Sequence, residues 1–339
     1  MSHSSRRDFL KQTIAAGVLA GVAPKILPAI PAKRTATDWV PLGNSGIKVT
    51  RLAFGTGTHG GRVQRELGQE QFTKLVRYAY EHGIRFFETA ESYQGMPQML
   101  SIALKGLPRD SYRLMTKMRS ANANDLPTAV DRLRAQLDTE YIDITLLHCV
   151  RTKGWAEEFK PIRDTFSEAK AKKQILAHGA SCHGTLPLSD FPGNKWLDVA
   201  LLRVNHDGTK MDTLRGDDRE PGDVPKITAT ISQVHGQGTG VIGMKTMGEG
   251  RFITPEQRDS SIKFVMGLGT VDAALIGMLT AFGASSNNAL AADMVWRATT
   301  YFPPIFIGSA TYLLWKRGLS RGIYAQRPDA VAAPVIGNE

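Results

Sequence analysis

The sequence predicts an α/β fold, a (β/α)8 TIM barrel with an N-terminal β-hairpin and an atypical hydrophobic C-terminal tail. Eight short apolar segments alternate with amphipathic helical patterns along the chain. The segments are apolar at nearly every position, as parallel strands are when other elements cover both of their faces. Eight such repeats form either a (β/α)8 barrel or a long doubly wound sheet, and the barrel is the preferred prediction. The chain has 339 residues, which leaves room for a barrel of roughly 250 residues and additional segments.

The hairpin is expected at residues 39–50. Apolar segments at 39–42 and 47–49 flank the sequence G-N-S-G, whose residues favour a tight turn.

The barrel strands are expected to begin directly after this hairpin. Their predicted ranges are 51–55, 85–90, 112–118, 142–148, 175–182, 197–205, 240–247 and 271–278. Two intervening helices show an apolar stripe at helical spacing. The stripes comprise Phe72, Leu75, Val76 and Ala79 in one helix, and Leu126, Val130, Leu133 and Leu137 in the other. A third helix is predicted to begin at Thr254, because Pro255 and Gln257 complete a typical capping sequence.

The first 34 residues are interpreted as a targeting segment outside the fold. They contain S-R-R-D-F-L-K at positions 5–11, which matches the twin-arginine export signature. The apolar run at 13–23 is too short to span a bilayer, and small residues and prolines follow at 24–32. We therefore expect the twin-arginine translocase as a partner and a periplasmic location. The alternative is a chance Arg-Arg pair before an amphipathic helix.

Composition excludes some functions. The formal charge is +10, but no basic run alternates with aromatic residues, so nucleic acid is not an expected partner. The chain has two cysteines, Cys149 and Cys182, which are too few for a metal cluster. Because they end neighbouring predicted strands, they either form a bridge or remain separate buried thiols.

Titratable side chains follow three successive predicted strands. Glu88 and then Tyr93 end one, Lys117 ends the next, and His148 ends the third. In a parallel barrel these strand ends converge on one face and share one site. The combination suits acid-catalysed carbonyl chemistry. Each residue also has a simpler interpretation: a solvated lysine, a core histidine, a helix-capping glutamate or a packed tyrosine.

Residues 39–278 resemble an aldo-keto reductase. The resemblance rests on L-G-N-S-G-I-K-V-T-R-L-A-F-G-T-G, G-I-R-F-F-E-T-A-E-S-Y, L-M-T-K-M, Y-I-D-I-T-L-L-H and G-V-I-G-M-K-T-M-G-E-G, in this order. It implies a nicotinamide cofactor across the C-terminal mouth of the barrel, a small carbonyl substrate and no metal. It also implies catalytic roles for Tyr93, Lys117 and His148. The family's aspartate falls on Glu88, which is one methylene longer.

The chemistry is consistent with these roles. Hydride delivery to a carbonyl carbon leaves charge on oxygen, which a nearby acid must neutralise. A phenol is a weak acid unless a cation stabilises its phenolate. Tyr93 is therefore the expected acid, Lys117 its tuning cation, Glu88 the anchor of that cation, and His148 the donor that orients the carbonyl.

Cofactor contacts follow from the resemblance. They fall on Gly55, Thr56, Ser181, Asn205, Lys245 and Asn288. Cys182 replaces an asparagine of the family's G-x-S-N segment, and the basic residue that usually follows the eighth strand is missing. NADP is the expected cofactor, with NAD as the alternative.

The C-terminal region departs from the family. The expected barrel domain is 38–283, followed by a helical, hydrophobic tail at 284–317 and a flexible C-terminus at 318–339. Residues 298–315 carry no charge, and Lys316 and Arg317 follow. This has the length of a marginal membrane span and resembles the last helix of lysylphosphatidylglycerol synthase/flippase-type proteins. The alternatives are an eighth barrel helix with an apolar flap, or a tail without a fitting role.

Two functions remain open from the sequence. One is an exported reductase of small carbonyl compounds. The other is a catalytically impaired barrel that binds a small ligand or partner, either free or tethered to a membrane. The changes at Glu88 and Cys182 motivate the second. The sequence does not define the substrate.

Overall fold

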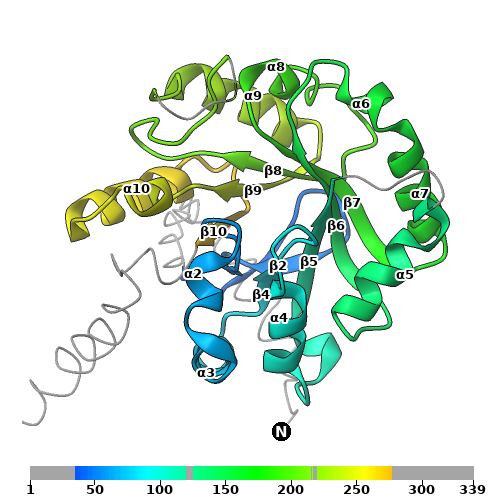
Figure 1. The fold of residues 1–339 in the computed structure, drawn as a ribbon. Helices are drawn as coiled ribbons and strands as arrows, with labels where there is room; N and C mark the ends of the chain where they lie inside the picture. The colour runs from blue at the N-terminus through cyan, green and yellow to red at the C-terminus, as the bar shows by residue number, and fades with distance from the viewer. Residues whose placement is uncertain (1–34, 120–124, 215, 217–219, 277–339) are drawn as a thin grey trace, which may run out of the picture. The chain divides into compact units, whose positions relative to one another are not determined.

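The computed structural model describes residues 35–119, 125–214, 216 and 220–276. Eight parallel strands close into a barrel in the order β10-β3-β4-β5-β6-β7-β8-β9 (Figure 1). Each strand thus lies beside its neighbours in the sequence, and β10 pairs with β3 to close the ring. This confirms the predicted fold class. The strands are β3 (Leu52–Gly55), β4 (Phe86–Glu88), β5 (Arg113–Met118), β6 (Ile142–Val150), β7 (Ile175–Cys182), β8 (Val199–Arg203), β9 (Gly240–Met244) and β10 (Ala273–Ile276).

Helices surround the barrel (Figure 1). They are α2 (Arg62–Arg65), α3 (Gly68–Glu81), α4 (Met96–Leu104), α5 (Leu126–Gln136), α6 (Trp155–Glu158), α7 (Lys160–Ala171), α8 (Thr185–Leu188), α9 (Val224–Gly236) and α10 (Pro255–Gly267), with 3-10 turns η1 (Arg109–Ser111) and η3 (Gly248–Gly250). Both predicted stripes face the core: Phe72 and Val76 are fully buried in α3 and Leu133 is 1% exposed in α5, while Leu75 and Leu126 are only partly buried. Thr254 and Gln257 form the predicted capping box of α10.

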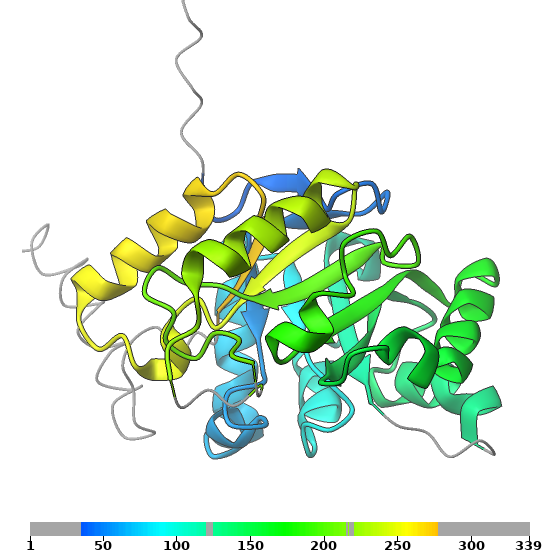
Figure 2. The ribbon, with the colours of Figure 1, turned by 90° about the horizontal axis from the view of Figure 1, so that it is seen from above.

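The predicted hairpin closes one end of the barrel. It consists of β1 (Trp39–Pro41) and β2 (Lys48–Thr50), which pair antiparallel (Figure 2). Its buried residues Leu42, Ile47 and Val49 belong to the same apolar cluster as the inward-facing residues of the strands. The backbone N–H of Asn44 donates to the carbonyl of Gly238, just before β9, at 2.8 Å. The hairpin therefore covers the N-terminal end of the barrel, opposite the C-terminal ends of the strands.

Several strands end earlier than the sequence predicted. The predicted strand 240–247 is too long. In the structure β9 ends at Met244, because Lys245 adopts a left-handed φ of 59° that a strand does not accommodate. The range 197–205 is also too long, because β8 ends at Arg203 and the side chain of Asn205 hydrogen-bonds the loop that follows. In contrast, β6 continues to Val150 through a β-bulge.

Cys149 and Cys182 are free, buried thiols, so the bridge is excluded. The twin-arginine segment 1–34, Asn288 and the apolar segment 298–315 lie outside the described residues. Within the part of the chain that the structure describes, no helix combines the length and apolar character needed to cross a membrane.

Candidate active site

The structure brings the four predicted catalytic side chains together at the C-terminal mouth. Glu88 ends β4, Lys117 lies one residue before the end of β5, and His148 lies two residues before the end of β6. Tyr93 lies in the loop between β4 and α4. The three strands are adjacent and parallel, so residues far apart in the sequence converge at one edge of the barrel.

Glu88 and Lys117 form a buried ion pair. Lys117 Nζ donates to Glu88 Oε1 and, at 2.8 Å, to the carbonyl oxygen of Thr89. Both Glu88 and Lys117 are only 1% exposed. The other carboxylate oxygen, Glu88 Oε2, accepts the backbone N–H of Thr56 at 3.2 Å. The longer glutamate side chain therefore still reaches the lysine, and three hydrogen bonds hold the pair in place.

Tyr93 lies between the lysine and the histidine. Lys117 Nζ is 4.8 Å from the centroid of the phenol ring, and the His148 ring meets the phenol edge-to-face with centroids 5.4 Å apart. The sequence predicted an ammonium in contact with the phenol, and the structure places that contact on the face of the ring. A cation over a tyrosine face is attracted electrostatically, so Lys117 both orients the ring and puts positive charge beside it.

Gly57 borders the phenol on a further side. A Cβ added to Gly57 would lie 2.5 Å from Tyr93 Oη and 2.6 Å from Cζ, well inside van der Waals contact. Glycine is favoured at position 57 because a side chain there would collide with Tyr93, and not because of the backbone conformation. We did not predict this residue from the sequence. Its signal is the second glycine of the F-G-T-G run after β3.

Burial shifts the proton affinities of this site. It raises the pKa of Tyr93 above the usual value of 10.0, and electrostatic interactions with Cys149 and Glu249 raise it further. It lowers the pKa of Lys117 well below 10.5. Burial and nearby cations, Lys117 among them, lower the pKa of His148 to about 3. Near neutral pH the phenol is therefore protonated and the imidazole is neutral.

A β-bulge fixes the end of the strand that carries His148. The pairing of β6 with β7 shifts register between Leu147 and Val150, and Cys149 adopts a left-handed φ of 62°. Ser181 Oγ accepts the Cys149 N–H at 2.7 Å and donates to the Leu147 carbonyl at 3.3 Å. Ser181 thus holds the bulge and keeps one free lone pair. Its predicted contact with a cofactor stays a prediction.

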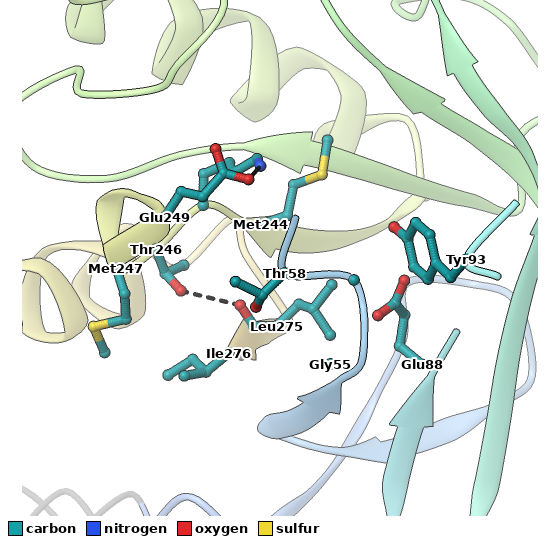
Figure 3. A pocket seen from close by; sticks show the side chains of 12 residues that line it. Gly55, Thr58, Glu88, Tyr93, Met244, Thr246, Met247, Glu249, Leu275 and Ile276 are labelled. Carbon is teal, nitrogen blue, oxygen red and sulfur yellow. Dashed lines mark hydrogen bonds and ion pairs between the residues drawn. The ribbon is translucent and has the colours of Figure 1, made fainter. Parts of the chain in front are cut away.

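The phenol and Glu88 line a pocket that encloses about 530 Å³, including its open mouth (Figure 3). Gly55 lines it as well, and a Cβ there would lie 2.9 Å from Leu275 Cδ1, so glycine keeps this wall open. Thr56 is fully buried beside Gly55, and its Oγ1 finds no hydrogen-bond partner among the described residues. Gly55 therefore lines the pocket, whereas Thr56 is not among its lining residues, and the contacts of both with a cofactor stay predictions.

Lys245 lines the same pocket and forms an ion pair with Glu249. Asn205 lies behind Lys245 and is fully buried. Its Nδ2 donates to the carbonyls of Lys245 at 3.0 Å and Thr209 at 2.6 Å, while its Oδ1 accepts the Gly208 N–H at 2.9 Å. These bonds give Asn205 a structural role in holding the backbone of Lys245. Glu249 was not among the predicted site residues, although it lies in the G-E-G run that follows β9.

The fold and site define the class of this protein: a parallel (β/α)8 barrel with a buried Glu–Lys pair, a phenol and an imidazole at its mouth. A model of the aldo/keto reductase family matches residues 51–263, which is more than half of the chain. The chain belongs to this family of oxidoreductases.

Individual relatives match over shorter stretches. The chain is 31% identical over 144 residues to "Probable aldo-keto reductase 1" of Glycine max, covering 39% of this chain and 40% of that protein. It is 33% identical over 118 residues to L-galactose dehydrogenase of Arabidopsis thaliana, covering 32% of this chain and 36% of that protein. The match thus spans less than half of each relative.

Solved structures share the fold. The holo form of an aldo-keto reductase from Bacillus halodurans superposes with a TM-score of 0.57 at 16% identity, covering 76% of this chain and 96% of that one. At this identity the likeness establishes the barrel architecture alone.

Proposed function

We propose that this protein is a nicotinamide-dependent reductase of small carbonyl compounds. The observation that carries the proposal is the arrangement around Tyr93. A buried Glu88–Lys117 pair lies under the face of its ring, and a neutral His148 lies against the edge. An acid, a tuning cation and a hydrogen-bond donor thus meet around the phenol, which itself lines an open pocket.

Tyr93 gives its proton to the carbonyl oxygen of the substrate. Burial alone makes the phenol a poorer acid, because it disfavours the phenolate. The Lys117 ammonium opposes this effect, since a positive charge beside the ring stabilises the phenolate that forms as the proton leaves. The carboxylate of Glu88 is a counter-charge that favours the charged form of Lys117, which burial disfavours, and it fixes the position of the amine.

His148 orients the carbonyl. Its Nδ1 lies 3.0 Å from Ser92 Oγ. When the serine donates to Nδ1, the proton of the neutral ring resides on Nε2, which can donate to a substrate oxygen. A pKa of about 3 keeps His148 a neutral donor at any pH near neutrality, so it does not compete with Tyr93 as the acid.

A nicotinamide dinucleotide is the ligand that we propose for this pocket. Gly55 and Gly57 line the pocket beside the phenol, and Lys245 is a cation of the kind that a phosphate requires, although Glu249 already pairs with it. When bound, the cofactor supplies the hydride. We place NADP before NAD because of the family, and a comparison of both dinucleotides distinguishes them.

The location is part of the proposal. The residues at 5–11 support export by the twin-arginine translocase to the periplasm, and those at 298–315 support contact with the membrane. Replacing Arg6 and Arg7 by lysine should retain the protein in the cytoplasm. Carbonate washing of membranes distinguishes a spanning tail, which resists extraction, from a packed one.

The reductase proposal is tested by fluorescence titration with NADPH and NADH, followed by a panel of aldehydes and ketones. The proposal is supported if the protein binds a reduced dinucleotide and at least one aldehyde or ketone then oxidises that dinucleotide. Binding without any turnover favours the alternative of a barrel that has kept a ligand site and lost catalysis. Binding of neither dinucleotide would remove the proposal.

A further inference from the structure

One ion pair on the pocket wall has no part in the proposed proton transfer. Lys245 Nζ donates to Glu249 Oε1, and the two side chains are only 20% and 16% exposed. Both residues line the pocket. Figure 3 shows Glu249 on the opposite side of the pocket from Tyr93 and Glu88, so a molecule that reaches the phenol also faces this pair.

The backbone holds this pair in an unfavourable conformation. Lys245 and Glu249 have φ angles of 59° and 53°, and the glycines at 248 and 250 have 56° and 86°. Residues with a side chain rarely adopt these values and keep them only where the surroundings enforce them. Here Asn205 Nδ2 and the Gly248 N–H both donate to the Lys245 carbonyl, at 3.0 and 2.8 Å. The fold thus stabilises a loop that keeps both charges at the pocket.

The charges on the pocket wall disfavour anions. Its charged lining residues are Glu88, Lys245 and Glu249. The charge of Glu88 is balanced by Lys117, so among the lining residues that the structure describes Lys245 is the cation available to an anionic ligand, and Glu249 already neutralises it. A phosphate can reach the ammonium only by displacing this carboxylate, which then lies close to the phosphate and repels it.

We propose that Glu249 is a specificity-determining residue that competes with the phosphate groups of the dinucleotide for Lys245 and so weakens dinucleotide binding. The inference rests on the proposed function, because it requires a nicotinamide dinucleotide as the ligand. Its consequence is fast release: an enzyme with this pair exchanges its cofactor more readily than one with an unpaired lysine.

The test is a fluorescence titration of the full chain with NADPH and with NADH at low salt. Glu249→Gln removes the charge and keeps the size, and should lower the dissociation constant about tenfold. Lys245→Met should raise it by a similar factor. Asp259→Asn is the matched control, because Asp259 pairs with Lys263 at 2.6 Å on the exposed face of α10, and should change nothing. Glu249→Asn is a second variant, since asparagine tolerates a left-handed backbone.

The two dinucleotides identify the phosphate involved. Equal tightening of NADPH and NADH by Glu249→Gln assigns the shared diphosphate, and tightening of NADPH alone assigns the 2′-phosphate. If both Glu249 variants fold but bind dinucleotides no more tightly than the wild type, the inference is wrong and the reductase proposal stands. If the wild type binds neither dinucleotide, both fail together.

Discussion

Removing the charge of Glu88 tests whether this carboxylate stabilises the buried ammonium of Lys117. Lys117 is 1% exposed, and its hydrogen bonds go to Glu88 Oε1 and to the Thr89 carbonyl. In Glu88→Gln the carbonyl bond remains but the ammonium loses its counter-charge. Breaking a buried pair in this way costs about 3–5 kcal/mol of unfolding free energy. We expect that loss at pH 7 in urea denaturation, together with loss of carbonyl reduction.

The stability defect of Glu88→Gln should change with pH in a direction that the pKa of Lys117 sets. Burial holds the pKa of Lys117 in the folded protein below the value of 10.5 expected in the unfolded chain. Between these two pKa values the unfolded chain binds more protons, so the contribution of Lys117 to stability rises with pH. Without the Glu88 carboxylate the pKa of Lys117 in the folded protein falls further, so the pH range between its folded and unfolded values becomes wider. The defect of Glu88→Gln should therefore shrink as the pH rises towards 10.5.

The control is Glu70→Gln, which removes an exposed partner of Lys74 on α3 and should leave stability nearly unchanged. A defect of Glu88→Gln that is as small as that of the control, or one that does not change with pH, would show that Lys117 is not held as a buried ammonium. The proposed tuning of Tyr93 would then lose its basis.

Three further predictions concern the surroundings of the phenol. Gly57→Ala should lower kcat about a hundredfold because the added methyl group displaces the phenol of Tyr93, while dinucleotide binding persists. Gly236→Ala is the control, because a Cβ there meets no atom within 4 Å. Equal rates in the two variants would contradict the steric argument. Ser181→Ala should lower the unfolding free energy by about 1–3 kcal/mol, because the buried Cys149 N–H loses its acceptor; a weaker dinucleotide affinity at unchanged stability would instead indicate a cofactor contact. The pH–rate profile should show no ionisation of His148 near 6.5, since its pKa lies at about 3; a step near 6.5 that disappears in His148→Gln would refute this.

The fold could be predicted because each barrel strand is a short apolar run between amphipathic helices. The site could be predicted because the ends of parallel strands converge, which places Glu88, Lys117 and His148 side by side once the barrel is assumed. The strand limits were less predictable. The left-handed backbone at Lys245 depends on bonds from Asn205 and Gly248 that no sequence pattern reveals.

The remaining features depend on contacts between loops. Gly57 approaches Tyr93 only because two loops from neighbouring strands meet at the mouth. Glu249 reaches Lys245 through a run of left-handed residues, and Ser181 bonds the bulge at Cys149. Such contacts are tertiary, so the chain by itself indicated the residue types but not their partners.

The reduction rate of Tyr93→Phe tests the central claim most directly. This substitution keeps the ring beneath the Lys117 ammonium and removes only the proton-donating hydroxyl. The account predicts unchanged dinucleotide binding and a rate of carbonyl reduction lower by at least about a hundredfold. A variant that binds the dinucleotide and reduces its substrate at the wild-type rate would contradict it.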